Sequence, residues 1–207
     1  MKKSKRKEME FQLRRAEILC EAEKIFASKG FHDTTMAEIA DASGFAIGTL
    51  YHFFDGKKNL YATMVTEKLE KMYSEIRGSV NREEIIINKI KKLVESQFCF
   101  VEKNVDFCDL IIRGEGMTVS DGGTILRERL IANYFKHIDF VANIMRLGIE
   151  AKVFKTMDPQ MMAYALLGVN RSFIYYWMLK ERDTLLSYKV DCVTNIFLEG
   201  VRLEVTE

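Results

Sequence analysis

The chain has 207 residues, of which 48% are hydrophobic and 29% charged, and it contains a single proline. This composition is typical of a globular protein, and the net charge of +1 excludes binding to nucleic acid through overall charge alone, so any basic surface must be local. Hairpin signals are scarce, and long stretches rich in Leu, Ile, Met, Lys and Glu predict an all-α fold of about nine helices.

The chain begins with a basic segment. Residues 2–7 contain five cations and no acid: Lys2, Lys3, Lys5, Arg6 and Lys7. We expect residues 1–9 to form a disordered arm, which either adds phosphate affinity without sequence preference or serves as a solvated tail. No apolar stretch follows it, so a signal peptide is not expected.

A first helix is predicted from about Glu10 to Ser28, with one apolar stripe and a glycine, Gly30, at its end. Phe31 is expected to fold back on that stripe. This helix would brace the two short helices that follow it. The stripe consists of Leu13, Ile18, Leu19, Ala22, Ile25 and Phe26.

Two short helices joined by a tight turn are predicted next. Thr35 and Glu38 fit a capping box, which starts a helix near Met36. The run stops at Ser43–Gly44, where glycine can take the positive φ of a sharp turn, and a second helix begins at about Ala46. This arrangement is typical of a helix-turn-helix, which reads double-stranded DNA.

The second short helix has two different faces. Ala46, Leu50, Phe53 and Phe54 are expected in the core, whereas Ile47, Gly48, Tyr51 and His52 lie opposite with Thr49 on the border. Glycine allows close approach to DNA, and the face lacks Arg, Asn and Gln, so specificity should lean on thymine methyls and DNA shape. Lys57 and Lys58 begin the next helix, where positive charge and the helix N-terminus can both face a phosphate.

The run from Thr34 to Leu60 resembles the signature of the TetR family of bacterial transcriptional repressors. The matching positions are Thr35, Ile39–Ala40, Ala42, Gly44, Ala46, Gly48–Tyr51, Phe53–Phe54, Lys57 and Leu60. Three departures are Ser43, inserted between an alanine and a glycine that are usually adjacent, Gly56 in place of a serine, and Lys58 in place of an acid. The last two weaken the cap of the next helix and add charge facing the DNA.

The residues and the resemblance together give a set of expected DNA contacts: Thr35, Ala46, Ile47, Gly48, Thr49, Tyr51, His52 and Lys57. Residues 10–57 would form the helix-turn-helix domain, and residues 58–207 a larger helical domain for effector binding and dimerisation. The resemblance implies a homodimer through the last two helices, a pseudo-palindromic operator, and release of DNA when a small effector enters the larger domain. A dimer would place two reading helices about 34–36 Å apart.

The rest of the chain predicts helices at about 58–79, 82–103, 106–117, 123–149, 158–180 and 186–204. Asp158–Pro159 is a good helix start. The segment from Met161 to Leu179 is apolar almost all round, but Asn170, Arg171 and Ser172 at its centre argue against a membrane span. We expect it to pack with one face on the core and the other on a second copy. The last helix would be its companion, through Val190, Val193, Ile196, Phe197 and Val201.

A pocket in the larger domain would be lined by aromatic and aliphatic side chains and would favour a small apolar or amphipathic effector. Most of these side chains could equally be ordinary core: Phe98, Phe100, Phe107, Ile111, Met117, Tyr134, Phe135, Tyr175, Tyr176 and Trp177. The charges expected nearest to such a pocket are those of Arg113, Glu115 and Arg171. Arg171 could instead pair with a carboxylate or face the dimer seam, or it could hold an anionic group of the effector. The chosen effector candidates are Phe107, Ile111, Arg113, Tyr134, Arg171 and Trp177.

Catalysis finds little support in the sequence. The four cysteines, Cys20, Cys99, Cys108 and Cys192, and the three histidines, His32, His52 and His137, show no metal-ligand spacing, and no hydrolase or phosphate-loop motif occurs. We therefore expect a cytoplasmic regulator with no metal and no cofactor rather than an enzyme. Two alternatives are a DNA-binding protein that is controlled by another protein or acts architecturally, and an enzyme or carrier with a vestigial N-terminal module.

Overall fold

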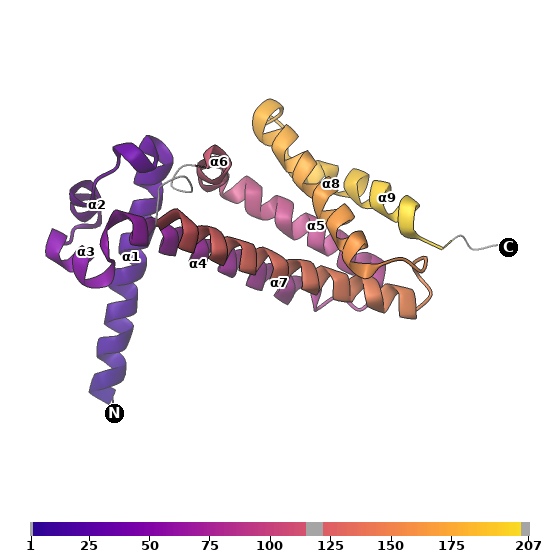
Figure 1. The fold of residues 1–207 in the computed structure, drawn as a ribbon, viewed down its shortest axis with the longest axis horizontal. Helices are drawn as coiled ribbons and strands as arrows, with labels where there is room; N and C mark the ends of the chain where they lie inside the picture. Colours follow the sequence, from indigo (N-terminus) through magenta and orange to yellow (C-terminus); the bar gives the residue numbers. More distant parts are fainter. Residues whose placement is uncertain (1, 115–121, 204–207) are drawn as a thin grey trace. The chain divides into compact units, whose positions relative to one another are not determined.

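The protein is helical throughout the residues that the computed structural model describes, 2–114 and 122–203, which confirms the predicted all-α fold (Figure 1). Within those residues, the extended structure is limited to one isolated bridge between Phe154 and Arg202. The helices are α1 (Lys2–Asp33), α2 (Met36–Ser43), α3 (Ile47–Phe53), α4 (Gly56–Val80), α5 (Ile86–Lys103), α6 (Val105–Arg113), α7 (Gly122–Glu150), α8 (Pro159–Lys180), the 3-10 helix η1 (Leu186–Lys189) and α9 (Val190–Val201).

The chain packs as two compact units. The N-terminal unit consists of Met1–Lys68 and Asp106–Leu130, and the C-terminal unit of Leu69–Val105 and Ile131–Glu207. Helix α4 is continuous through the boundary, so its first half belongs to one unit and its second half to the other. The functional boundary that the sequence suggested between residues 57 and 58 stays a prediction.

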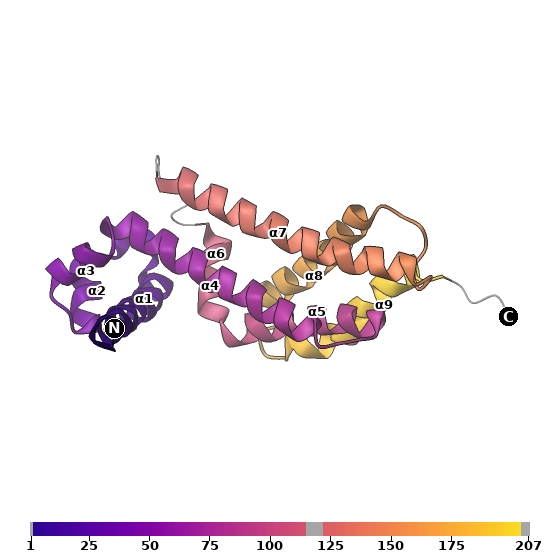
Figure 2. The same cartoon turned by 90° about the horizontal axis from the view of Figure 1, so that it is seen from below.

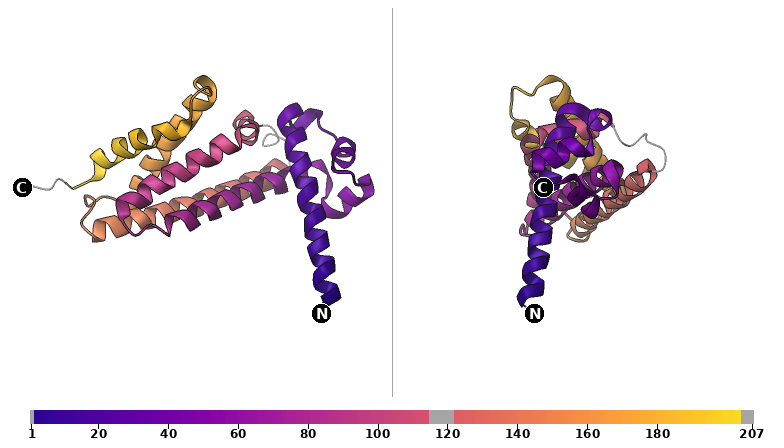
Figure 3. Two further views of the ribbon diagram at one scale, coloured as in Figure 1. Left: turned by 180° about the vertical axis from the view of Figure 1, so that it is seen from behind. Right: turned by 90° about the vertical axis from the view of Figure 1, so that its left-hand side faces the viewer.

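The first helix is longer than the sequence predicted. It begins at Lys2, so the expectation of a disordered arm over residues 1–9 is wrong for residues 2–9. Lys, Arg, Glu, Gln and Leu are good helix formers, and pairs one turn apart add support. Gln12 donates to Glu8, and Arg14 pairs with Glu10 at 2.5 Å. The first turns of α1 extend beyond α2 and α3 (Figure 3).

The core of the N-terminal unit joins α1, α2, α3 and the start of α4 around an aromatic cluster. Gly30 takes φ 81°, which bends the chain at the end of α1 and confirms its predicted place there. Phe31 folds back as expected, because its ring stacks on Phe26 at 6.0 Å and meets Tyr61 edge-on. Further buried side chains in these helices include Ile18, Ala22, Met36, Ile39, Ala40, Leu50, Phe54, Leu60, Met64 and Val65.

In the C-terminal unit α5 packs against α8, α9 and η1, and α8 and α9 lie side by side (Figure 2). Asp158 caps α8 as predicted, by accepting from the backbone of Gln160 and Met161. Helix α8 has two faces, as the sequence suggested. Its buried face consists of Met162, Ala163, Leu166, Leu167, Asn170, Trp177 and Met178. Its large exposed apolar side chains are Met161, Tyr175, Tyr176 and Leu179.

None of the helices found in residues 2–114 and 122–203 is both long enough and apolar enough to cross a membrane. This includes α8, whose apolar character made it the one candidate in the sequence. Asn170 and Arg171 interrupt it at its centre, as expected.

Close packing in the C-terminal unit predicts that Gly148→Ala destabilises the protein by about 1–3 kcal/mol. A Cβ on Gly148 of α7 would lie 2.2 Å from Cδ2 of the Phe154 ring, which is fully buried and cannot move aside. Gly78→Ala is the matched control, because a Cβ there meets nothing within 4 Å and alanine favours the helix by about 0.5–1 kcal/mol. Urea unfolding measures both, and equal stability of the two variants would contradict the packing.

Candidate nucleic-acid interface

The helix-turn-helix begins with a complete capping box. Thr35 Oγ1 accepts from the backbone N–H of Glu38 at 3.2 Å, and the Glu38 carboxylate accepts from the backbone N–H of Thr35 at 2.9 Å. A hydrogen bond from Lys29 and those from Thr35 lower the pKa of Glu38 to about 2, so the carboxylate stays ionised. The predicted cap is confirmed. The Thr35 hydroxyl is therefore already used within the protein, although its side chain is exposed.

The turn and α3 follow the expected pattern. Gly44 takes φ 72° and ends α2, and α3 then begins one residue after Ala46. Leu50 and Phe54 are buried, and Phe53 is half-buried. Ala46, expected in the core, is exposed instead, because it precedes the helix as its N-cap and is not yet on the helix face.

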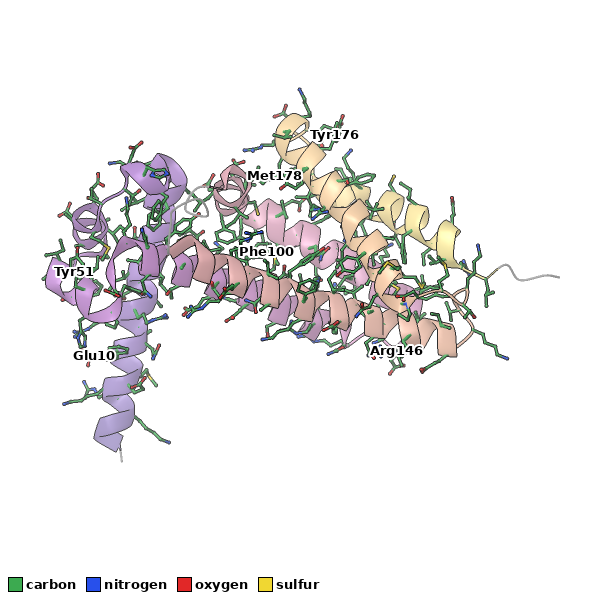
Figure 4. The ribbon with its side chains drawn as sticks, viewed as in Figure 1. Glu10, Tyr51, Phe100, Arg146, Tyr176 and Met178 are labelled. Atoms are coloured by element: carbon green, nitrogen blue, oxygen red, sulfur yellow. The ribbon has the colours of Figure 1, made fainter. Side chains whose placement is uncertain are left out.

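The outward face of α3 is exposed as predicted. The Ile47 side chain is 46% exposed and Tyr51 is 57% exposed, and His52 is also exposed. Tyr51 lies on the outer side of α3 in Figure 4. A Cβ built on Gly48 meets nothing within 4 Å, so the fold itself does not require glycine at this position. This face of α3 is therefore accessible to a partner, and it carries no side chain at Gly48.

A groove of about 470 Å³ separates α3 from the first turns of α1. Its lining comes from Lys7, Glu10, Phe11 and Arg14 of α1 and from Gly48, Thr49, His52 and Phe53 of α3. Phe11 packs on Phe53 with ring centroids 4.4 Å apart and meets the His52 ring edge-on at 6.2 Å. Phe11 of α1 therefore packs against the side chains of His52 and Phe53 of α3.

Sequence reasoning missed this contribution from α1. Lys7, Phe11 and Arg14 recur at spacings of four and three, which places them on one helix face. That spacing was the signal available in the sequence. Phe11 and Arg14 lay inside the predicted helix, and only Lys7 fell in the segment before Glu10 that was expected to form no helix.

Lys57 is placed differently from the expectation that it faces a phosphate. Its Nζ donates to the backbone carbonyls of Phe31 at 2.7 Å, His32 at 3.0 Å and Thr34 at 2.7 Å. It also lies 4.7 Å from the centre of the Phe31 ring. An ammonium group has three donors, and here all three are used inside the N-terminal unit. This geometry gives Lys57 a structural task at the end of α1.

The effector candidates are divided between the two units. Phe107 is buried and Ile111 half-buried on α6, which packs in the N-terminal unit. The side chain of Arg113 lies outside what the structure describes, as do Glu115 and Met117.

The remaining candidates, Tyr134, Arg171 and Trp177, belong to the C-terminal unit. Trp177 is buried and donates from Nε1 to the Thr184 carbonyl at 2.7 Å, which satisfies its polar atom. Tyr134 is half-buried on α7, and Arg171 is exposed on α8. Arg171 is therefore exposed and not part of the core of the C-terminal unit.

No group of three or more acidic, cysteine or histidine residues able to hold a metal occurs in the part of the chain that the structure describes. The four cysteines are free thiols. Burial raises the pKa of the Cys108 thiol to about 12, so this thiol stays protonated and unreactive at neutral pH.

Comparison with known proteins agrees with this geometry. The family model described as bacterial regulatory proteins of the tetR family matches residues 18–64, which contain the second half of α1, the helix-turn-helix and the start of α4. The transcriptional activator FasR of Mycolicibacterium smegmatis is 24% identical over 169 residues, which cover 82% of this chain and 74% of FasR. The transcriptional repressor KstR2 of Rhodococcus jostii is 38% identical over 67 residues, covering 32% of this chain and 33% of KstR2.

A solved structure shares the whole fold. The transcriptional regulator FadR from Bacillus subtilis, in complex with stearoyl-CoA, has a TM-score of 0.77 at 17% identity, over 89% of this chain and 98% of FadR. Its likeness covers the helices beyond the helix-turn-helix as well. The capped helix-turn-helix, the open face of α3 and the family match lead to one assignment: residues 18–64 are the N-terminal domain of a bacterial regulatory protein of the TetR family.

Proposed function

We propose that this protein is a dimeric repressor that binds a pseudo-palindromic operator and leaves it when an apolar effector of the fatty-acyl type binds. The observation that carries the proposal is the open face of α3, Ile47, Gly48, Tyr51 and His52, held on a capped helix-turn-helix. The regulators it resembles include KstR2, a repressor, and FadR, solved with stearoyl-CoA.

The proposed DNA contacts are of two kinds: those made by side chains of α3, and those made with phosphate by positive charge beside α3. Ile47 can contact a thymine methyl, while the Tyr51 hydroxyl and the His52 imidazole can reach a base edge or a phosphate. Lys7 and Arg14 line the groove beside α3. Arg14 is paired there with Glu10, so we assign the phosphate contact that Lys57 does not make to Lys7. Such contacts with phosphate give affinity that falls steeply with salt.

Gly48→Ala tests the DNA-binding face without harming the fold. Because the Cβ meets nothing within 4 Å in the free protein, the variant should be as stable as the wild type or up to about 1 kcal/mol more stable. When the protein binds DNA, the added methyl group would hold α3 away from the major groove of the DNA, and we expect at least about tenfold weaker binding. Operator sequences would first be selected from random DNA with the wild-type protein. Fluorescence anisotropy then measures how tightly the wild type and the variant bind the selected DNA.

The matched control is again Gly78→Ala, an exposed glycine of α4 with equal free space around it. It should bind the selected DNA as the wild type does. If Gly48→Ala binds as tightly as this control, α3 does not approach DNA closely. Selected sequences without an inverted repeat would contradict binding as a dimer.

The proposed dimer interface is the exposed side of α8 and α9. Met161, Tyr175, Tyr176 and Leu179 of α8 leave large apolar surfaces in water, and Ile196 of α9 does the same. Tyr176 lies near the end of α8 in Figure 4. Symmetric dimers are the commonest oligomers, and burying such a face would remove this exposure. Arg171 shares the exposed side of α8, which favours the dimer seam over the pocket for its guanidinium.

Release by the effector requires a connection from the C-terminal unit to α3. Helix α4 supplies it, because its first half packs against α1 and its second half belongs to the C-terminal unit. Within the N-terminal unit, Lys68 of α4 pairs with Glu23 of α1 and lies 4.8 Å from the centre of the Phe107 ring of α6. A ligand that prefers one position of α4 would thus shift the population that can bind DNA.

Activation instead of repression is the second candidate function, because FasR is an activator and matches over most of this chain. A reporter gene under the selected operator separates the two: expression rises on removal of a repressor and falls on removal of an activator. Either role places the protein with chromosomal DNA in the cytoplasm, and neither calls for catalysis.

A further inference from the structure

Three polar side chains form a hydrogen-bonded string in the interior of the C-terminal unit. Asn170 Nδ2 of α8 lies 2.5 Å from Gln97 Oε1 of α5, and Gln97 Nε2 lies 3.0 Å from His137 Nε2 of α7. His137 and Asn170 are each 1% exposed. The two ends of the string, His137 Nδ1 and Asn170 Oδ1, are buried and have no hydrogen-bond partner among the residues that the structure describes.

The two free ends have opposite hydrogen-bonding character. Because Gln97 donates to His137 Nε2, the imidazole carries its proton on Nδ1, which leaves a free donor at one end and the Asn170 carbonyl oxygen as a free acceptor at the other. Turning both amides over reverses the string, and the free ends then become an acceptor on His137 and a donor on Asn170. In either orientation one donor and one acceptor remain.

The string is packed against aromatic rings, and the charge of Arg77 acts on its His137 end. The His137 ring stacks on Tyr73 of α4 with centroids 4.5 Å apart, and the Phe140 ring lies on it at 6.4 Å. Burial, together with the positive charge of Arg77, lowers the pKa of His137 to about 4, so the imidazole is neutral at pH 7. An orphaned buried donor or acceptor costs about 1–3 kcal/mol, and proteins rarely retain two of them together.

We propose that this string, Gln97–His137–Asn170, binds an uncharged group of the effector that both donates and accepts a hydrogen bond, such as a hydroxyl on an aliphatic chain. The inference rests on the proposed function and assigns the polar end of its effector. A carboxylate fits less well, because it is only an acceptor and would lose its hydration beside neutral partners. A ligand held at His137 touches the ring that stacks on Tyr73, and Tyr73 belongs to α4, the helix that continues into the N-terminal unit.

Isothermal titration of the full-length protein with three probes of equal length tests this assignment. Octan-1-ol donates and accepts, heptyl methyl ether of the same shape only accepts, and octanoate is charged. We expect octan-1-ol to bind about tenfold more tightly than the ether, as one hydrogen bond would give, and more tightly than octanoate. Equal binding of the alcohol and the ether, or tightest binding of octanoate, would overturn the proposal.

A triple variant, Gln97→Met, His137→Phe and Asn170→Leu, removes all three partners at once and leaves no orphaned polar atom, so its core should remain packed. The preference for the alcohol over the ether should disappear in it. Thr194→Val is the control, because it removes a buried hydroxyl donor of the same unit outside the string and should keep the preference. A triple variant that retains the preference contradicts the assignment, and the wild-type comparison still decides if the variant fails to fold.

The proposed function fails separately from this assignment. If the alcohol and the ether bind equally and both release the selected DNA, the effector response stands and the string has no recognition role. If the alcohol binds preferentially but DNA stays bound, the string recognises its ligand and release by this class of effector is wrong.

Discussion

Replacement of Lys57 by alanine is expected to destabilise the N-terminal unit by about 2–4 kcal/mol, a larger effect than the loss of one phosphate contact on DNA. The Lys57 ammonium donates hydrogen bonds to three backbone carbonyls at and just after the end of α1, those of Phe31, His32 and Thr34. A hydrogen bond to a charged group contributes about 1.5–3 kcal/mol, and the three are not additive because they share one cation. Positive charge at a helix C-terminus and over an aromatic ring adds to them.

Hydrogen exchange across α1, α2 and α3 would show this loss as faster exchange that begins at the end of α1. Lys24→Ala is the matched control, since Lys24 is exposed and its pair with Glu21 one turn away should contribute less than about 0.5 kcal/mol. DNA binding by Lys57→Ala would then fall because fewer molecules are folded. A variant that is as stable as the control, yet loses affinity with a lower salt slope, would return Lys57 to the phosphate contact that its sequence position suggested.

Lys57 illustrates which features a sequence can predict. The capping box of Thr35 and Glu38 and the left-handed Gly44 were predictable, because each depends on residues three or four positions apart. The carbonyls that Lys57 binds lie 23 to 26 positions earlier in the chain, and nothing local marks them as its partners. The same limit applied to the two faces of α3. Leu50 was correctly assigned to the core from periodicity, but Ala46 was not, because the exact start of a helix decides its first positions.

Long-range contacts also explain why the effector site was less predictable than the DNA site. Aromatic side chains such as Trp177 suggested a pocket lining, but the indole N–H of Trp177 donates its hydrogen bond to the Thr184 carbonyl within the protein. Gln97, His137 and Asn170 are 40 and 73 positions apart along their hydrogen bonds. Asn170 alone drew notice in the sequence, as an interruption in an apolar helix. Only the packing of α5, α7 and α8 shows that Asn170 is hydrogen-bonded to Gln97 and, through it, to His137.

His137 should make the C-terminal unit lose stability as the pH falls from about 6.5 to about 4. Burial and the charge of Arg77 depress its pKa to about 4 in the folded protein, whereas the unfolded chain keeps the ordinary value of 6.5. Between these values the unfolded state binds a proton that the folded state does not, so stability declines with acid. The loss from this group is about 2 kcal/mol at pH 5 and approaches about 3 kcal/mol near pH 4, and it changes little above pH 7.

Urea unfolding at pH 7, 6 and 5 measures this loss, and Trp177 is a convenient probe because it is the single tryptophan and lies buried in the same unit. The triple variant without His137 is the comparison. Glu38, with its pKa lowered to about 2, titrates in both proteins and cancels between them. The wild type should lose about 2 kcal/mol more than the variant between pH 7 and pH 5. Parallel losses in the two proteins would mean that His137 is accessible to protons in the folded state, and therefore that the string does not lie in a dry interior.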